Sequence, residues 1–514
     1  MSRLRFPLAV LVAYAWLFPW LPELRSPNEL SRLYQARAIA DDHSLSVNEQ
    51  LDRRGPIGDL SAKDGRTYPN KAPGISLLGA PVYAAVRALR GGAERVSDRA
   101  GIFFLRLVLC MVPGAIAAEL LRRILARRFA PAAALAGATA FALSVPMWPY
   151  STLLMSHGPT AAALVGAWWA LEQERAGPSG GPDAWPVLAG FLLGLSVLLD
   201  YTSALMFLPL AAYGVAGAGR RARTAALLAA GAIPPLLALA LYHQAAFGHP
   251  LDTGYRHLVN PAFAAMHARG FLSLGRPDLN ALGAAFVSPA RGLFFFSPFL
   301  LLALPGLGLL WVRDRRLGFL SGAALAVYGL FAASFHIGNW GWTVGPRHLA
   351  ALPAFLLPAA LEAEERLRAR GLGAVPAALA LLSVGTAALV MATGPYLPEE
   401  LSNPVHQLSV PLASLGLHAH DLLGMALGSA SPWTLAPWAA LVAFLAARAA
   451  RAFLPHGPAP LRLSSFAGAV ALASVLFLAG GLLGGPDRYE ETRRFLVERW
   501  EPVPGRAPGI FAPP

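Results

Sequence analysis

The chain has 514 residues, of which 55% are hydrophobic and 14% are charged, and its mean hydropathy is +0.49. Soluble globular proteins carry about 25% charged residues, so this composition excludes a soluble protein and indicates one that lies in a membrane. The net charge of +13 comes largely from arginines at the ends of apolar runs, a pattern typical of membrane orientation and not of a nucleic-acid-binding surface.

Apolar runs recur along the whole chain. A transmembrane helix needs about 20 largely apolar residues, whereas transmembrane β-barrels show alternating segments of about ten residues. The runs therefore predict an all-α fold, a polytopic bundle of transmembrane helices. The first run lacks a small-residue cleavage site, so we expect an uncleaved first helix that starts in the cytoplasm. The runs are 6–22, 102–121, 130–150, 159–173, 186–219 (long enough for two helices), 225–243, 292–312, 317–335, 349–361, 373–393, 433–450 and 465–484.

Arginine clusters between the runs predict which loops face the cytoplasm. Cytoplasmic loops of membrane proteins collect Lys and Arg. Placing every cluster inside gives about thirteen crossings, provided that the segment 74–90 does not span the membrane. Pro81 interrupts this segment and basic residues follow it, so we expect a helix along the membrane surface; if it crossed instead, the first cluster would lie outside. The clusters are 122–128, 220–223, 313–316, 366–370 and 448–451.

The same scheme leaves three long loops outside, at about 25–101, 244–291 and 394–432. We treat residues 1–485 as one transmembrane domain whose first outer loop contains juxtamembrane helices. Residues 486–514 form a short outer tail, too short for a domain, in which 488–500 could be an amphipathic surface helix.

Polar residues gather in segments that this scheme places on the outer side. The first patch is Asn28–Lys71, the second is Ser156-His157-Gly158, and the third runs from Trp340 to His348. The loop 244–291 adds a fourth wall that contains Tyr255. Polar patches that converge on one surface of a membrane bundle predict a site there, and the first loop is the best candidate.

Residues 26–43 of the first loop have helical spacing, with Ser26 or Asn28 as the cap. This spacing places Glu29 and Arg32 on or near a polar side close to the membrane surface. A carboxylate in that position could act as general base toward an acceptor hydroxyl. The structural alternative is that Glu29 belongs to a capping arrangement or pairs with Arg32 three residues later.

Lys71 stands before the segment 74–90, and Lys63 is the only other lysine of the chain. An ammonium group at headgroup depth suits a phosphate because it is a compact point charge. The alternative is a lysine that merely extends to the membrane interface. The polar character of the whole loop favours the phosphate.

Several motifs resemble those of a known superfamily. They are Asn28-Glu29 after the first helix, the turn Tyr68-Pro-Asn70-Lys71-Ala-Pro73-Gly74, Arg106 in the next helix, and Gly345-Pro346-Arg347-His348-Leu-Ala-Ala-Leu-Pro. Together they resemble the GT-C superfamily of membrane glycosyltransferases, in the family-39-like branch of protein O-mannosyltransferases and lipid A aminoarabinose transferases. The resemblance covers most of the chain in layout and is specific in these patches.

The resemblance implies that a sugar moves from a polyprenyl-phosphate carrier to an unknown acceptor, a lipid, glycan or protein. The reaction would take place on the outer face of the cytoplasmic membrane, which is the cell inner membrane, on a multi-pass protein. Glu29 would be the base, Lys71, Arg347 and Arg32 would hold the phosphate, and the apolar groove beside 74–90 would take the lipid tail. The further substrate-binding residues would be Asn28, Tyr68, Asn70, His157, Tyr255 and His348.

Three positions depart from the pattern of the family. Asn28 stands where relatives often have Asp, Asn70 where they often have Glu or Asp, and His157 where they often have an acidic residue. The amides weaken any metal site, so we assign no metal ligand and leave open whether a divalent metal takes part. Cys110 is the only cysteine, which excludes a disulfide framework and a cysteine metal site.

Two other functions fit a polytopic chain. A transporter or lipid flippase would place ionisable residues near mid-membrane, often in repeated halves. Here most of the polar residues lie instead in segments predicted to be on the outer side. An inactive GT-C-like assembly subunit is the second alternative, because Asn28 replaces a carboxylate.

Overall fold

The computed structural model describes residues 4–20, 26–176, 183–268, 273–335, 341–454 and 458–484. The outer tail 486–514 and Trp340, both named above, lie outside these residues. In the described part the chain is almost wholly helical, and the short strands make two small two-stranded ladders. The all-α fold predicted from the apolar runs is confirmed.

Each predicted apolar run contains at least one helix, because a helix satisfies its own backbone hydrogen bonds where lipid offers none. One span is continuous through a π-helical turn, from α5 (Asp98–Arg106) into α6 (Val112–Leu125). The other long helices are α1 (Arg5–Ala15), α7 (Pro131–Ala142), α9 (His157–Ala176), α10 (Ala184–Leu199), α11 (Ala204–Gly217), α12 (Arg221–Phe247), α16 (Ala303–Arg313), α17 (Arg315–Ser334), α18 (Leu352–Ala369), α19 (Ala374–Thr393), α22 (Ala436–Phe453) and α23 (Ala459–Gly480).

Six helices among the described residues are long and apolar enough to cross a membrane, and shorter apolar helices accompany them. The chain is therefore a multi-pass membrane protein. The number of crossings, about thirteen, and the boundaries of the outer loops stay predictions. The six helices are Asp98–Leu125, Arg221–Phe247, Arg315–Ser334, Ala374–Thr393, Pro432–Phe453 and Pro460–Gly480.

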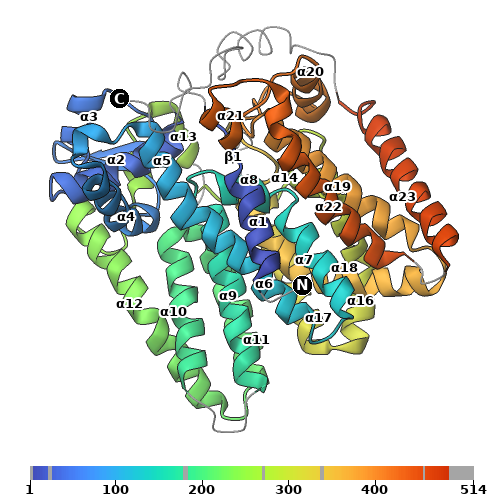
Figure 1. Ribbon diagram of the computed structural model, residues 1–514. Helices are drawn as coiled ribbons and strands as arrows, with labels where there is room; N and C mark the ends of the chain where they lie inside the picture. The colour runs from blue at the N-terminus through green and yellow to red at the C-terminus, as the bar shows by residue number, and fades with distance from the viewer. Residues whose placement is uncertain are drawn as a thin grey trace.

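The shorter elements collect at one end of the bundle. Figure 1 shows α2, α3, α4 and α13 together at this end, from which α10 and α12 run toward the opposite end. The segment 74–90 forms a helix, α4, as predicted. The shorter elements are α2 (Pro27–Asp41), α3 (Asn48–Arg54), α4 (Gly74–Arg90), α8 (Met147–Thr152), α13 (Pro261–His267), α14 (Leu279–Phe286), α15 (Leu293–Phe296), α20 (Val410–Ser414), α21 (Leu422–Leu427), β1 (Leu17–Phe18) and β4 (His420–Asp421).

Helix α2 is enclosed, which corrects the expectation that it presents a polar side to the membrane surface. Glu29, Arg32, Gln35 and Arg37 are all buried. Glu29, Gln35 and Arg37 find partners on neighbouring elements; Gln35, for example, donates to the hydroxyl of Tyr242 on α12 at 2.7 Å. Arg32 instead donates to Asn28 within α2. Since an unpaired buried polar group is costly, these partners allow a polar helix to occupy the interior.

A β-hairpin joins the segment between α1 and α5 to the loop after α12. Strands β2 (Leu60–Lys63) and β3 (Arg66–Pro69) pair across the turn Asp64-Gly65, whose residues have φ of 51° and 74°. Two positive φ values in a two-residue turn are typical of type I′ hairpins, which favour Asp-Gly. We did not predict this hairpin, although the Asp-Gly pair was its signal. Ser61 of β2 also bridges to Leu258, so loops about 200 residues apart in sequence lie side by side.

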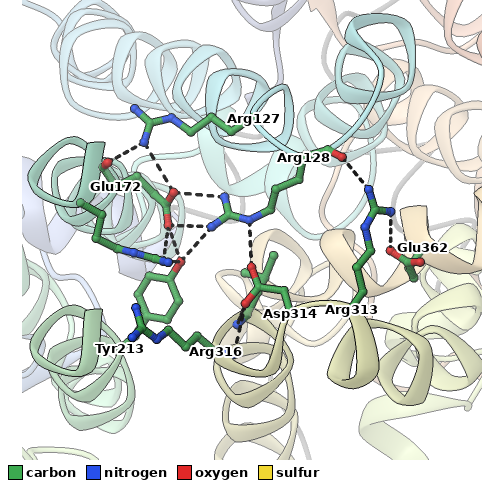
Figure 2. A network of polar contacts seen from close by, with 10 residues as sticks. Arg127, Arg128, Glu172, Tyr213, Arg313, Asp314, Arg316 and Glu362 are labelled. Carbon is green, nitrogen blue, oxygen red and sulfur yellow. Dashed lines mark hydrogen bonds and ion pairs between the residues drawn. The ribbon is translucent and has the colours of Figure 1, made fainter. Parts of the chain in front are cut away.

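Two of the predicted arginine clusters, 122–128 and 313–316, meet at the opposite end of the bundle. Figure 2 shows Arg128 between Glu172 of α9 and Asp314, which precedes α17. Its guanidinium lies 3.1 Å from Glu172 Oε2 and 3.3 Å from Asp314 Oδ2. Arg313 donates to the carbonyl oxygen of Arg128 at 3.0 Å and contacts Glu362 of α18 at 2.9 Å. This arginine network ties α9, α16, α17 and α18 together at their ends.

Candidate functional site

Glu29 forms a fully buried ion pair with Arg106, which joins α2 to α5. Arg106 Nε and Nη2 donate to the two carboxylate oxygens, each at 2.8 Å. The amide of Leu154 donates to Oε1 at 2.7 Å and the Tyr396 hydroxyl to Oε2 at 3.1 Å. Burial alone would raise the pKa of Glu29, but the Arg106 charge and these hydrogen bonds hold it below the usual range. The partner of Glu29 is thus Arg106 and not Arg32.

A carboxylate enclosed in this way has no exposed atom to offer an acceptor. The geometry therefore favours a positioning role for Glu29, because a role as base would require it to leave Arg106. Its neighbour Asn28 accepts from the Arg32 guanidinium through both its side-chain and its backbone oxygen. The Asn28-Glu29 motif thus stabilises α2 and orients Arg32.

Lys71 lies at the centre of the candidate site, in an ion pair that sequence reasoning missed. Its Nζ is 3.2 Å from Oδ1 of Asp59, and the two side chains are 16% and 11% exposed. The ring of Tyr255 lies below the ammonium, 5.6 Å from Nζ to the ring centroid. The turn after Lys71 packs tightly on α10, because a Cβ at Gly74 would lie 2.6 Å from the Leu198 carbonyl oxygen.

Arg32 and Arg347 complete the positive charge around Asp59. Burial alone would raise the pKa of Asp59, but the charges of Lys71, Arg347 and Arg32 hold it below its usual range. We call Lys71, Arg32, Arg347 and Asp59 the cation cluster. Three cations against one carboxylate leave an excess of positive charge, so the cluster favours a second anion.

His157 and His348 lie beside the cation cluster. Nδ1 of His157 is 2.9 Å from Oδ2 of Asp200, which follows α10. The two histidine rings meet edge to face with centroids 5.1 Å apart. Arg347 Nε lies 3.4 Å from Nε2 of His348, which connects the histidines to the cluster. The second patch, through His157, and the third patch, through Arg347 and His348, therefore meet the first.

The remaining predicted residues support the walls of the site. Tyr68 is buried with its ring edge against Phe247, 5.4 Å between centroids. Asn70 is buried, and its backbone N–H donates to the Asp59 carbonyl oxygen at 2.9 Å, which fixes the backbone at Asp59. Tyr255, besides facing Lys71, stacks near His267 at 4.7 Å between ring centroids.

Three residues of the candidate site are not predicted from the sequence: Asp59, Asp200 and His267. Asp59 has a φ of 59°, a left-handed conformation that Asp tolerates better than most residues. The pair Gly58-Asp59 indicates a turn in the sequence, but nothing in it says that the turn faces Lys71. Asp200 could be found as a carboxylate ending an apolar run, although nothing in the sequence says that its partner is His157, at the start of the neighbouring helix α9.

An apolar groove of about 440 Å³ runs beside α4, as the sequence predicted for the lipid tail. Its walls come from the later turns of α4 and from the span α5–α6, and it begins at Pro81, about 10 Å along the helix from Gly74 at 1.5 Å per residue. The lining residues are Pro81, Val82, Ala85, Val86, Leu89, Arg90, Phe104 and Val108. What occupies the groove stays a prediction.

The described residues contain no group of three or more His, Cys, Asp or Glu side chains that could hold a metal ion. The carboxylates and histidines of the site are instead engaged pairwise, Asp59 with Lys71 and Asp200 with His157. Cys110 is buried in the span α5–α6.

The site predicts that stability falls as the pH drops below 6.5. Burial and the Lys71 charge lower the pKa of His267 to about 4, whereas an unfolded histidine has a pKa of about 6.5. Between these values only the unfolded state takes up the proton, so stability rises with pH from about 4 to about 6.5. Asp59, whose pKa is depressed, adds a contribution that is present above about 3.9 and lost as the pH falls through its folded value.

Thermal unfolding of the detergent-solubilised protein between pH 4 and pH 8, followed by tryptophan fluorescence, measures this dependence. His267→Gln should remove part of the slope between pH 4 and pH 6.5. An identical slope in the variant and the wild type would contradict the assignment to His267.

Comparison with protein-family models and with curated proteins gives no match. Among solved structures, ArnT from Cupriavidus metallidurans bound to undecaprenyl phosphate is similar at a TM-score of 0.47 and 16% identity, over 97% of this chain and 80% of ArnT. Its apo form gives 0.45 and 15%, over 96% and 79%. Arabinosyltransferase EmbB from Mycobacterium smegmatis gives 0.42 and 14%, over 97% of this chain and 41% of EmbB. Both neighbours are membrane glycosyltransferases of the GT-C superfamily. None of these likenesses bears on the roles of individual residues.

Proposed function

We propose that this chain is a GT-C-type membrane glycosyltransferase that moves a sugar from a polyprenyl-phosphate carrier to an acceptor. The observation that carries the proposal is the cation cluster, in which Lys71 lies 3.2 Å from Asp59 and the charges of Arg32 and Arg347 also act on that carboxylate. Charge-assisted hydrogen bonds from Lys and Arg are the strong contacts that proteins make to phosphate. The motifs that resemble the superfamily supply two of these cations, Lys71 and Arg347.

The cluster supports sugar transfer by stabilising the leaving group. As the bond from the sugar to the phosphate breaks, negative charge grows on the phosphate oxygens, and fixed cations lower the energy of that state. Asp59 balances the cations in the absence of donor. The groove beside α4, which begins about 10 Å along the helix from Gly74, supplies an apolar surface for the polyprenyl chain.

The two ends of α9 support an outer-face reaction. His157 at its start borders the cation cluster, and Glu172 near its end belongs to the arginine network. At 1.5 Å per residue they lie about 22 Å apart along the helix, a distance comparable with the membrane interior of about 30 Å. Since arginines mark the cytoplasmic side, the cluster would face the exterior of the cytoplasmic membrane.

The test is the purified full-length protein with undecaprenyl-phosphate-linked pentoses and hexoses as donors. We expect one donor to be consumed, with release of undecaprenyl phosphate and a glycosylated acceptor. Labelling of Asp64→Cys by an impermeant thiol reagent on intact cells checks the outer placement, because the native Cys110 is buried. The proposal fails if no donor is consumed and undecaprenyl phosphate does not bind; movement of intact donor across a bilayer would indicate a flippase instead.

A further inference from the structure

The pair His157 and Asp200 has the form of a general base held by a carboxylate. His157 is the first residue of α9, and Asp200 follows the last residue of α10. Their side chains are 9% and 11% exposed and meet at 2.9 Å through Nδ1 and Oδ2. A close approach of the chain fixes the place of His157, because a Cβ at Gly158 would lie 2.1 Å from the Tyr150 carbonyl oxygen.

Both oxygens of Asp200 are engaged. Oδ2 also accepts from the Ser156 hydroxyl at 3.1 Å, and Oδ1 accepts from the Thr202 amide at 3.0 Å and the Thr202 hydroxyl at 2.8 Å. A carboxylate only accepts hydrogen bonds when ionised, so the nitrogen of His157 that faces it carries the hydrogen. Nε2 is then the nitrogen with the lone pair, the state that a histidine base requires.

The neighbours of the pair place it at the edge of the cation cluster. The rings of Tyr150 on α8 and His348 stand nearly perpendicular to that of His157, with centroids 5.3 and 5.1 Å away. The charges of Arg347 and of Arg32 on α2 act on His157 as well as on Asp59. A phosphate in the cluster would therefore lie next to this histidine.

The other groups of the first loop are less suited to remove a proton. The Glu29 carboxylate is enclosed by Arg106, and Asn28 is an amide. Asp59 is in an ion pair with Lys71 at 3.2 Å, which makes it a weak base. His157 differs from these groups because its partner is a carboxylate, Asp200, and not a cation.

We propose that His157, oriented by Asp200, accepts the proton of the acceptor, and that the acceptor therefore reacts through a hydroxyl or amine and not through a phosphate. The inference rests on the proposed function. The acceptor heteroatom forms a bond to the anomeric carbon, and the bond from that carbon to the phosphate oxygen breaks. Its electron pair leaves with the polyprenyl phosphate, the acceptor proton moves to Nε2, and Asp200 stabilises the imidazolium until it returns the proton to water.

The experiment uses the full-length protein with the undecaprenyl-phosphate-linked sugar that the wild type consumes, and compares His157→Gln and Asp200→Asn. Turnover with a hydroxyl acceptor should fall about 100–1,000-fold in each, while binding of undecaprenyl phosphate stays within a few-fold of wild type. In Asp200→Asn the side-chain oxygen can still accept from the Thr202 amide. Its NH₂ group can then face Nδ1 of His157, which disfavours the tautomer with the hydrogen on Nδ1 that a base needs. The matched control is His418→Gln, a buried histidine whose two nitrogens lie 2.8 and 3.1 Å from backbone carbonyl oxygens; its turnover should stay near wild type.

Two further readouts separate a base from a structural residue. Wild-type turnover should fall on the acid side as one group takes up a proton, and this limb should be absent in His157→Gln. Added imidazole should restore part of the turnover of His157→Ala, which a residue needed only for folding would not allow. Unchanged turnover of His157→Gln, or transfer by the wild type to a phosphate monoester alone, would overturn the inference and leave the glycosyltransferase intact. Failure of the wild type to consume any donor would instead count against the proposed function.

Discussion

Glu29→Gln should destabilise the protein by about 3–5 kcal/mol, the range found when one partner of a buried ion pair is removed. The change leaves the guanidinium of Arg106 without its counter-charge in the interior, where both side chains are fully buried. It also weakens the hydrogen bonds from Leu154 and Tyr396 that converge on the carboxylate. Loss of activity in this variant should follow loss of folded protein.

Chemical denaturation of the purified variant measures the effect, with Glu49→Gln as control, since Glu49 lies in the same loop with its side chain 64% exposed. The double variant Glu29→Gln with Arg106→Met removes both charges and should recover part of the stability. Normal stability with loss of transfer in Glu29→Gln would contradict a positioning role and support the base predicted from the sequence.

Lys71→Ala should lower sugar transfer about 100–1,000-fold, the range found when one donor to a developing oxyanion is removed. The change removes the cation in contact with Asp59 and leaves that carboxylate to repel an incoming phosphate. Binding of undecaprenyl phosphate should weaken in parallel, because the proposed function has the ammonium contact the phosphate in the bound donor as well as in the transition state. Isothermal titration with undecaprenyl phosphate and turnover with the sugar donor give the two numbers.

Lys63→Ala is the matched control. Lys63 is the other lysine of the chain and also pairs with an aspartate, at 3.4 Å from Asp252, but it stands on the hairpin β2–β3 against the loop after α12. Its replacement should lower stability slightly and leave phosphate binding unchanged. Equal effects of the two variants would contradict a specific role of Lys71.

The helices themselves could be predicted from the sequence. Each apolar run became a helix because the interior of a membrane leaves the backbone no other partner than itself. The same reasoning identified 74–90 as a helix, which is α4. Apolar runs do not reveal the hairpin at 60–69, because the sequence signal of such a hairpin is a two-residue turn and not a long apolar pattern.

The convergence of the patches was also predictable, since arginines fix which loops share a side. Lys71, Arg347 and His157 come from three of the predicted patches, and Arg347 and His157 both lie next to His348 while the charges of Lys71 and Arg347 act on Asp59. What could not be predicted is which partner each polar residue takes. Helical spacing suggested Arg32 as the partner of Glu29, whereas a better one, Arg106, lies 77 residues away.

The sequence by itself determined a polytopic helical membrane protein, and it predicted the loops that meet at one end and Lys71 as a cation of the candidate site. Only the tertiary structure decided that Glu29 is enclosed, that Asp59 faces Lys71, and that Asp200 orients His157. The physical reason is that local pattern sets burial and helix formation over a few turns, whereas ion pairs in a buried site depend on packing. Close contacts such as Gly74 on α10 and Gly158 on α8 bring these distant side chains within hydrogen-bond distance.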